Sequence, residues 1–323
     1  MSLIETALAK LRRGGDSDTT LPAGEPPRGV VVAASTPKPA PVAAASTPKP
    51  APAAAASTPK PAAVVAPPAP AREYLLKRIS IDMHALRRAG YLPEEGLERR
   101  FADHFRQIKR PLIDKALSGG DANMRLILVS SALPGDGKTF TSINLALSMA
   151  RERDVSVLLV DADAPRARIG EVLGLRGERG LLDALSDESL DVQSLIVQTD
   201  VPGLEILPAG KLVESAPELF ASTRMEQIAA ALAARNPRQL IVFDSAPLLV
   251  SSEARALLRI PGQVALVIRF GLTPRQAVLD AAAYVDKRKL QGLILNQASL
   301  AGAGDYYGYP AYGASSDETS DAR

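Results

Sequence analysis

One short segment, Ser131–Thr139 with the sequence SALPGDGKT, restricts the fold of this chain more than any other feature. It follows the apolar run 126–130 and precedes a predicted helix near 138–151, which is the context of a loop that wraps nucleotide phosphates. The pattern is A-x4-G-K-T, with alanine where such loops usually carry their first glycine. A plain glycine turn is the alternative, but motif and context together favour a phosphate-binding loop.

The residue types in this loop suit separate tasks. Gly135 and Gly137 let backbone N–H groups curl around phosphate oxygens, and a helix start near Lys138 favours anions. Lys138 would bridge the β- and γ-phosphates of ATP, and Thr139 would be a ligand of Mg²⁺. The predicted nucleotide contacts in the loop are Pro134, Gly135, Asp136, Gly137, Lys138, Thr139 and Phe140.

From residue 125 onward, apolar runs alternate with helical patterns. Continuous runs such as VLLV and LIVF are typical of parallel strands that are covered on both faces. The alternation predicts an α/β fold, a doubly wound and mostly parallel sheet with helices on both faces and ligands at the carboxyl ends of the strands. The predicted strands are 126–130, 155–160, 204–207, 240–244, 263–269 and 292–295. The predicted helices are 73–79, 94–117 with Pro93 in its first turn, 138–151, 181–185, 224–235, 252–258 and 274–287.

Carboxylates follow two of these strands. Asp161 and Asp163 end the run VSVLLV, and there they could organise magnesium and take a proton from an incoming hydroxyl. Asp244 ends the run LIVF and matches a Walker B carboxylate, which holds the Mg²⁺ shell. We therefore predict Lys138, Asp161, Asp163 and Asp244 as catalytic, and Thr139, Asp161 and Asp244 as metal ligands. The alternative for Asp161 and Asp163 is that they are turn-forming residues that cap the end of the strand. Arg166, shortly after them, would face phosphate or pair with an acidic side chain.

Asn296 follows the predicted strand 292–295. Its side-chain amide offers both a donor and an acceptor, so it could bind the edge of adenine. A turn residue at the end of a strand is the alternative reading.

The last part of the chain holds four of its seven tyrosines: Tyr306, Tyr307, Tyr309 and Tyr312. They stand among Gly, Ala, Ser and Asp, with little apolar bulk to pack around the rings. A folded domain usually buries tyrosine in its core, so this placement predicts accessible hydroxyl groups that accept phosphate. A sticky, unmodified tail is the alternative.

Composition divides the chain into four parts. We expect residues 1–15 to form an amphipathic helix that packs against a partner, a membrane surface or the main domain. We expect residues 16–72 to be a disordered Pro/Ala-rich linker. The linker repeats an ASTPKPA unit every 11 residues, with serines at Ser35, Ser46 and Ser57. We expect a P-loop domain over 73–300 and a flexible Tyr-rich tail over 301–323.

Composition also excludes several classes of site. The chain has 323 residues and no cysteine, which excludes disulfides, thiol nucleophiles and cysteine-ligated zinc. Two histidines are too few for a histidine-built metal site, and a net charge of +2 does not call for nucleic acid. No apolar run reaches the length of about 18 residues that marks a membrane helix, and no signal peptide is recognisable. We therefore expect a cytoplasmic protein.

The phosphate loop and the two aspartate motifs, in this order, resemble those of the bacterial tyrosine kinases of exopolysaccharide synthesis, over most of residues 75–312. The closer resemblance is to the exosortase-associated tyrosine autokinases. A wider kinship links both to ATPases with a deviant Walker A motif, which position division and partition machinery. Those ATPases carry a signature lysine where this chain has Leu133. The segments that carry the resemblance are MSLIETALAKLRRG, FRQIKRPLIDKAL, SALPGDGKTFTSINLALSMA, VLLVDADAPRARIG, LEILPAGK and the Tyr-rich end.

The resemblance implies further roles. It implies ATP and Mg²⁺ as cofactors. It also implies a homo-oligomer in which the tail tyrosines of one subunit accept phosphate from a neighbouring subunit. A partner would hold the protein at the inner membrane. That partner would be a membrane chain-length determinant protein of polysaccharide export. The family's oligomerisation motif, Glu-x-x-Arg-x-x-Arg, aligns with Asp103, Arg106 and Lys109. A basic cluster late in the domain would be Lys287, Arg288 and Lys289, unless these residues form an ordinary solvated helix end.

The sequence thus predicts an ATP-dependent tyrosine autokinase that acts on its own tail and regulates the length and export of exopolysaccharide chains. Two alternatives remain open. One is a positioning ATPase of the deviant Walker A group, against which Leu133 and the tail argue. The other is a non-catalytic, nucleotide-binding regulator of a polysaccharide synthase, against which the intact lysine and aspartates argue.

Overall fold

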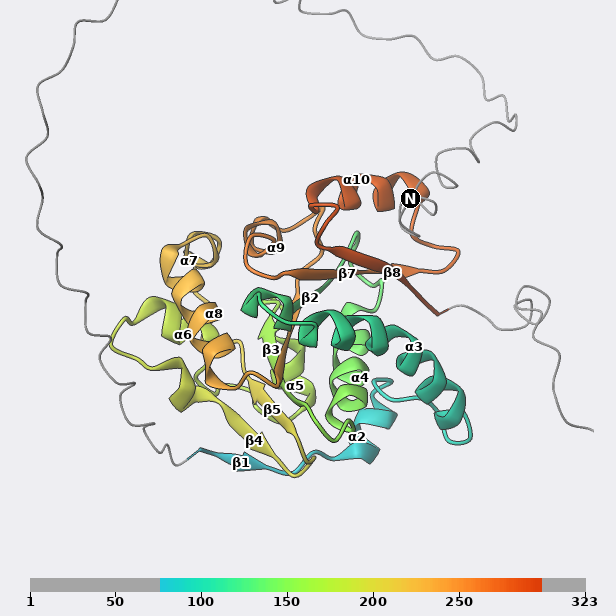
Figure 1. Ribbon diagram of the computed structural model, residues 1–323, viewed down its shortest axis with the longest axis horizontal. Helices are drawn as coiled ribbons and strands as arrows, with labels where there is room; N and C mark the ends of the chain where they lie inside the picture. Colours follow the sequence, from blue (N-terminus) through green and yellow to red (C-terminus); the bar gives the residue numbers. More distant parts are fainter. Residues whose placement is uncertain (1–75, 298–323) are drawn as a thin grey trace, which may run out of the picture. The chain divides into compact units, whose positions relative to one another are not determined.

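The computed structural model of the protein describes residues 76–297. These residues form one eight-stranded sheet in the order β1-β4-β5-β3-β6-β2-β7-β8 (Figure 1). All neighbouring strands are parallel except β4 and β5, which are antiparallel. The strands are β1 (Arg78–Ile79), β2 (Leu126–Ser131), β3 (Ser156–Ala162), β4 (Val197–Thr199), β5 (Leu204–Leu207), β6 (Gln239–Ser245), β7 (Gln263–Arg269) and β8 (Leu290–Asn296).

Helices pack on both faces of this sheet, so the predicted α/β fold class is confirmed. The α-helices are α2 (Met83–Arg88), α3 (Glu98–Leu117), α4 (Lys138–Ala150), α5 (Arg168–Val172), α6 (Leu181–Ser186), α7 (Ala216–Phe220), α8 (Thr223–Arg235), α9 (Ser252–Leu257) and α10 (Arg275–Tyr284). Two short 3₁₀ helices, η1 (Ala122–Arg125) and η2 (Val192–Leu195), complete the described part.

The central strands are buried on both faces, which explains why they are continuously apolar. Leu126 and Leu128 of β2 belong to a hydrophobic cluster that includes residues of α6 to α10. Ile127 and Val129 of the same strand belong to a second cluster, with residues of α2 to α5. Successive side chains of a strand point to opposite faces, so an unbroken apolar run supplies both cores at once.

The N-terminal part of this domain differs from the prediction in three places, one of which is the helix α2 (Met83–Arg88), which was not predicted. Arg78–Ile79 form a short edge strand beside β4 instead of the end of a helix over 73–79. The helix predicted to begin at residue 94 begins at Glu98. Gly96 has φ +88°, which is not a helical conformation, so the helix starts after it. Pro93 therefore precedes the helix and is not part of its first turn. A two-residue strand has too little periodicity for a sequence pattern to reveal it.

Several predictions fall outside the described residues: the N-terminal helix, the linker of residues 16–72 and the tyrosine tail. No helix within residues 76–297 combines the length and the hydropathy needed to cross a bilayer.

Candidate active site

The phosphate-loop segment joins β2 to α4 at the carboxyl edge of the sheet. Its backbone needs glycine twice, since φ is +87° at Gly135 and +95° at Gly137. Gly137 is also the N-cap residue of α4. A Cβ atom there would lie 1.8 Å from Nδ2 of Asn296, whereas a Cβ atom at Gly135 would meet nothing within 4 Å. Close packing and backbone conformation therefore both require glycine at position 137, immediately before Lys138.

Side chains from distant parts of the chain hold the tip of this loop. Asp136 is only 4% exposed, and its Oδ2 accepts a hydrogen bond from the backbone N–H of Leu133 at 2.9 Å. Its Oδ1 accepts one from the Thr273 hydroxyl at 2.7 Å. Asn296 donates its side-chain amide to the carbonyl oxygen of Asp136 at 3.0 Å. The residue predicted for adenine therefore contacts the loop backbone in this structure.

The three predicted aspartates and the loop lysine meet beside the loop. Because β3 and β6 are neighbours, Asp161 and Asp244 are directly paired across the sheet. Nζ of Lys138 lies 2.6 Å from Oδ2 of Asp163, and both side chains are almost fully buried, with exposed fractions of 8% and 2%. Residues separated by more than 100 positions in the sequence thus form one polar cluster in a dry site.

Asp161 is fully buried, and within residues 76–297 its carboxylate accepts hydrogen bonds only from backbone N–H groups. Its Oδ1 accepts from the N–H of Asp163 at 3.3 Å, and its Oδ2 accepts from the N–H of Gly170 at 3.2 Å. Burial, followed by the nearby negative charge of Asp244, raises the pKa of Asp161 to about 7. A carboxyl group that titrates near neutral pH can exchange protons during a reaction.

Asp244 is completely buried at the end of β6. Its Oδ1 accepts a hydrogen bond from the Ser142 hydroxyl at 3.0 Å. In the described part of the chain its Oδ2 has no hydrogen-bond partner of standard geometry, although the charge of Lys138 and the nearby Thr139 hydroxyl both lower its pKa. Burial is the stronger effect and raises the pKa of Asp244 to about 6. A buried carboxylate oxygen without a partner is an available ligand for a cation.

These residues fit a magnesium ion that is bound together with a nucleotide. Within residues 76–297 no group of three or more carboxylate or histidine side chains could hold a metal alone. Mg²⁺ typically takes one or two protein carboxylates and completes its shell with waters and substrate phosphates. Thr139, at the start of α4, and Asp244, with its free Oδ2, supply oxygen ligands of that kind.

The other predicted loop residues have different surroundings. Pro134 and Gly135 are exposed at the loop tip. Phe140 is half-buried, and its ring makes an edge-on contact with Phe101 of α3 at a centroid distance of 6.1 Å. The carbonyl oxygen of Phe140 accepts a hydrogen bond from Asn144 at 2.8 Å. Phe140 therefore links α4 to α3.

The three residues aligned with an oligomerisation motif do not share one surface. Asp103 and Arg106 pair with each other at 2.7 Å and are 60% and 62% exposed. Lys109 is buried, and its Nζ contacts the carbonyl oxygen of Ser148 at 2.6 Å and the carboxylate of Glu152 at 2.9 Å. The ammonium group of Lys109 therefore binds the C-terminal end of α4 within the same chain, not a neighbouring subunit.

The basic cluster at the end of α10 is also partly engaged. Arg288 pairs with Asp286 at 2.9 Å. Lys289 donates to the carbonyl oxygen of Leu258 at 3.0 Å, which attaches it to the end of α9. Lys287 is exposed.

Sequence reasoning missed two residues of the site. Ser142 stands one helical turn after Lys138 and therefore on the same face of α4, a spacing from which its contact with Asp244 could have been expected. Thr273 contacts Asp136 across 137 positions. No local pattern signals such a contact.

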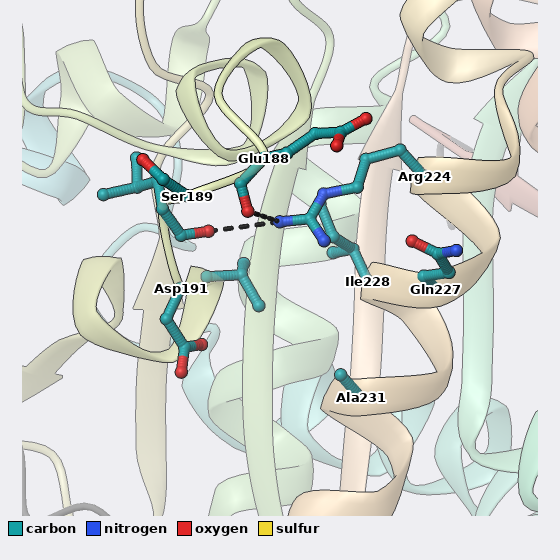
Figure 2. Close-up of a pocket in the computed structure, with 9 residues that line it drawn as sticks. Glu188, Ser189, Asp191, Arg224, Gln227, Ile228 and Ala231 are labelled. Carbon is teal, nitrogen blue, oxygen red and sulfur yellow. Dashed lines mark hydrogen bonds between the residues drawn. The ribbon is translucent and has the colours of Figure 1, made fainter.

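Two cavities lie outside the loop itself. One, of about 230 Å³, lies between α8 and residues 188–192 (Figure 2). Arg224 lines it and donates to the carbonyl oxygens of Glu188 at 3.3 Å and Leu190 at 3.2 Å. These bonds hold the segment after α6 against α8. None of the lining residues belongs to the cluster of Lys138 and the three aspartates. The other cavity, of about 220 Å³, begins directly after Asp163 and is lined in part by Arg166.

Comparison with known proteins agrees with this geometry. A family model described as an AAA domain matches residues 124–268. Tyrosine-protein kinase YwqD of Bacillus subtilis is 29% identical over 188 residues, which cover 58% of this chain and 78% of that protein. Tyrosine-protein kinase wzc of Salmonella typhimurium is 28% identical over 61% of this chain. This protein is a homologue of the bacterial tyrosine-protein kinases.

Solved structures of such kinases share the fold. The BceF tyrosine kinase domain is 27% identical, has a TM-score of 0.54, and is matched over 67% of this chain and 86% of its own. The kinase domain of Escherichia coli tyrosine kinase ETK is also 27% identical, with a TM-score of 0.51 over 59% of this chain and 74% of its own. The matched part spans only 27% of the Salmonella kinase. This tyrosine kinase homologue therefore corresponds to one portion of the longer relatives.

Proposed function

We propose that this protein is an ATP-dependent tyrosine autokinase that phosphorylates Tyr306, Tyr307, Tyr309 and Tyr312 of its own tail. One observation carries the proposal. In a homologue of tyrosine kinases, a buried lysine of a phosphate loop and three strand-end aspartates form a single cluster. The tyrosine-rich segment on the same chain provides acceptors.

The loop residues bind the triphosphate. Lys138 leaves Asp163 and bridges the β- and γ-phosphates, while the backbone N–H groups around Gly135 and Gly137 face the phosphate oxygens. Thr139, Asp161 and Asp244 would hold Mg²⁺ directly or through water, and the ion, when bound, neutralises charge on the phosphates. Asn296 donates its side-chain amide to the loop backbone, and the rest of that amide would bind the edge of adenine.

Transfer to tyrosine needs a proton acceptor, because the pKa of a free phenol is about 10. When Lys138 turns to the phosphates, the carboxylate of Asp163 loses its ion-pair partner and takes the phenolic proton. The phenol oxygen forms a new bond to the γ-phosphorus, and the bond from that phosphorus to the β–γ bridging oxygen breaks. The products are phosphotyrosine and ADP. The positioning of these groups supplies most of the rate enhancement.

Assembly regulates the reaction in this proposal. Chains associate into a homo-oligomer through the exposed Asp103 and Arg106, and each tail is phosphorylated by a neighbour. The kinase acts at the cytoplasmic side of the inner membrane, held there by a chain-length determinant protein of polysaccharide export. Its phosphorylation cycle regulates the length and export of exopolysaccharide chains. The supports are the resemblance carried by the sequence motifs and the kinase homologues.

The test is incubation of the purified chain with Mg·ATP, followed by mapping of phosphate by mass spectrometry. We expect phosphate on the tail tyrosines and none in a Lys138→Ala variant. Trans reaction is tested by mixing that variant, as acceptor, with a chain whose four tail tyrosines are phenylalanine. ATP hydrolysis without phosphotyrosine, even with the partner's cytoplasmic segment present, would contradict the kinase and favour a positioning ATPase.

A further inference from the structure

A turn of residues 269–273, at the carboxyl end of β7, contacts the phosphate loop through one side chain. Strands β2, β7 and β8 are parallel neighbours, so their carboxyl ends lie at one edge of the sheet. The hydroxyl group of Thr273 donates a hydrogen bond of 2.7 Å to Oδ1 of Asp136. Asp136 lies between Gly135 and Gly137, the two loop residues with positive φ. The contact therefore reaches the most sharply bent part of the loop.

The side chain of Thr273 is itself held in place by its own turn. Its Oγ1 accepts a hydrogen bond from the backbone N–H of Arg269 at 2.9 Å, and its backbone N–H donates to the carbonyl oxygen of Arg269 at 3.0 Å. A hydroxyl group has one proton to donate and can accept as well. Because Oγ1 accepts from Arg269, its proton is directed to Asp136, and the turn presents one oriented donor to the loop.

The end of β8 joins the turn to the loop a second time. The backbone N–H of Phe270 donates to the carbonyl oxygen of Asn296 at 2.9 Å, and Nε of Arg269 donates to the side chain of Gln297 at 2.5 Å. Asn296 in turn donates its side-chain amide to the carbonyl oxygen of Asp136. The turn, the end of β8 and the phosphate loop thus form one closed circuit of hydrogen bonds.

A carboxylate within a loop for phosphates needs such a restraint, because it has the same sign of charge as the ligand. Within residues 76–297 no lysine or arginine pairs with Asp136, and its oxygens accept only from Thr273 and from the N–H of Leu133. Without the hydroxyl of Thr273, Oδ1 would lose its only partner among these residues. The carboxylate would then be free to turn toward a bound nucleotide and repel its phosphates.

We propose that Thr273 is a positioning residue of the nucleotide site. Its hydroxyl group holds Asp136, and through Asp136 the phosphate loop, in the conformation that binds nucleotide phosphates. The inference rests on the proposed function, in which this loop binds ATP. Thr273 acts through Asp136 and has no part in the chemical step, so its loss should raise KM for ATP and leave kcat near the parent value.

Titration of the full chain with Mg·ADP tests this without phosphoryl transfer. Thr273→Val keeps the shape of the side chain and removes the hydroxyl group. It should raise the Kd about tenfold, the loss expected for one hydrogen bond to a charged group. Thr273→Ser keeps a hydroxyl group and should restore the Kd to near the parent value. A valine variant that binds like the parent chain, or a serine variant as weak as the valine variant, overturns the proposal.

The matched control is Thr199→Val, which removes a buried hydroxyl group far from the loop. Thr199 lies in β4, four strands from β2, is 5% exposed, and donates to the carbonyl oxygen of Leu204 at 2.9 Å. This change should lower the free energy of unfolding and leave the Kd for Mg·ADP unchanged. A rise in Kd equal to that of Thr273→Val would mean that general destabilisation weakens binding, and it would overturn the positioning role.

A double-mutant cycle identifies Asp136 as the group through which Thr273 acts. Asp136→Ala removes the acceptor, so adding Thr273→Val to it should change the Kd by less than about twofold, whereas independent sites would show additive effects. A further tenfold loss in the double variant would overturn the proposal. Failure of the kinase proposal is recognised separately, as a parent chain that binds Mg·ADP but forms no phosphotyrosine with Mg·ATP.

Discussion

The ammonium group of Lys138 lies 2.6 Å from the carboxylate of Asp163, and both are buried. The lysine that must bind nucleotide phosphates is thus already neutralised by the carboxylate that we propose as the base. Binding of a nucleotide has to divide this pair. Each partner then acquires a new task, phosphate binding for the lysine and proton transfer for the aspartate.

Asp163→Asn should therefore destabilise the nucleotide-free chain more than the nucleotide-bound chain. The change leaves Lys138 buried without a counter-charge, for which we expect a loss of about 3 kcal/mol in the free energy of unfolding. Mg·ATP supplies a new partner, so it should stabilise the variant more than the parent chain, while tail phosphorylation is lost. Denaturant unfolding with and without nucleotide measures this. Equal stabilisation of parent and variant would contradict the role of the pair.

Gly137→Ala should impair the loop far more than Gly135→Ala. Both changes force a Cβ atom onto a positive φ, which costs about 1–2 kcal/mol. Only at position 137 does the Cβ atom also collide with Asn296. Asn296→Ala should therefore reduce the effect of the change at 137 and leave that at 135 unaltered. Free energies of unfolding and nucleotide titrations on the three single variants and the two double variants test this, and an equal effect of Asn296→Ala at both positions would refute the steric account.

The raised pKa of Asp161 predicts a pH-dependent stability. Between pH 4 and 7 the folded chain keeps a proton on Asp161 that the unfolded chain has lost, so the free energy of unfolding falls as pH rises through this window. The loss is about 4 kcal/mol at most, since one pKa unit corresponds to about 1.4 kcal/mol. Asp161→Asn should show a flatter pH profile in denaturant unfolding. A parallel profile for both chains would show that Asp161 does not titrate there.

Lys109→Ala and Arg106→Ala should affect different properties. Lys109 is buried against Ser148 and Glu152, so its removal should lower the free energy of unfolding by about 2 kcal/mol. Arg106 is exposed, so its removal should leave stability nearly unchanged and reduce oligomer size. Denaturant unfolding and light scattering separate the two effects. Unchanged stability of the Lys109 variant would mean that its buried contacts are weak.

Phosphorylation of the tail should separate the subunits. Each phosphate adds a charge of about −1.5 to −2, and several on adjacent tails repel one another. After incubation with Mg·ATP, light scattering should find smaller particles for the parent chain than for a chain in which Tyr306, Tyr307, Tyr309 and Tyr312 are phenylalanine. The same size for both chains would refute a cycle driven by phosphorylation.

The central sheet was predictable because burial on both faces leaves a strong pattern. The predicted strands 204–207 and 263–269 have the bounds of β5 and β7. Parallel strands end at one edge, so the proximity of Asp161, Asp244 and the phosphate loop followed from the strand ends alone. The short strands β1 and β4 were missed, because two or three residues carry no usable periodicity.

Other parts of the site depend on side-chain contacts that local patterns do not encode. Thr273 reaches Asp136 from a loop after β7. Lys109 aligned with an oligomerisation motif, yet its long side chain turns inward to the end of α4. The cavity of about 220 Å³ is formed by residues 164–178 and 208–212, two segments that are distant in the sequence, and neither of them alone indicates it.

The contact between Asn296 and the phosphate loop determines where the tyrosine-rich segment begins relative to the nucleotide site. Asn296 touches the phosphate loop, and the chain continues from it directly into the segment that bears the tyrosines. Tyr306 follows Asn296 by ten residues, so an assembly of chains would hold the acceptors near neighbouring donor sites, and linkage of this kind gives millimolar effective concentrations. At such concentrations a weak acceptor site is filled without tight binding. A phosphorylated tyrosine can then leave quickly, and the next one along the same tail can take its place.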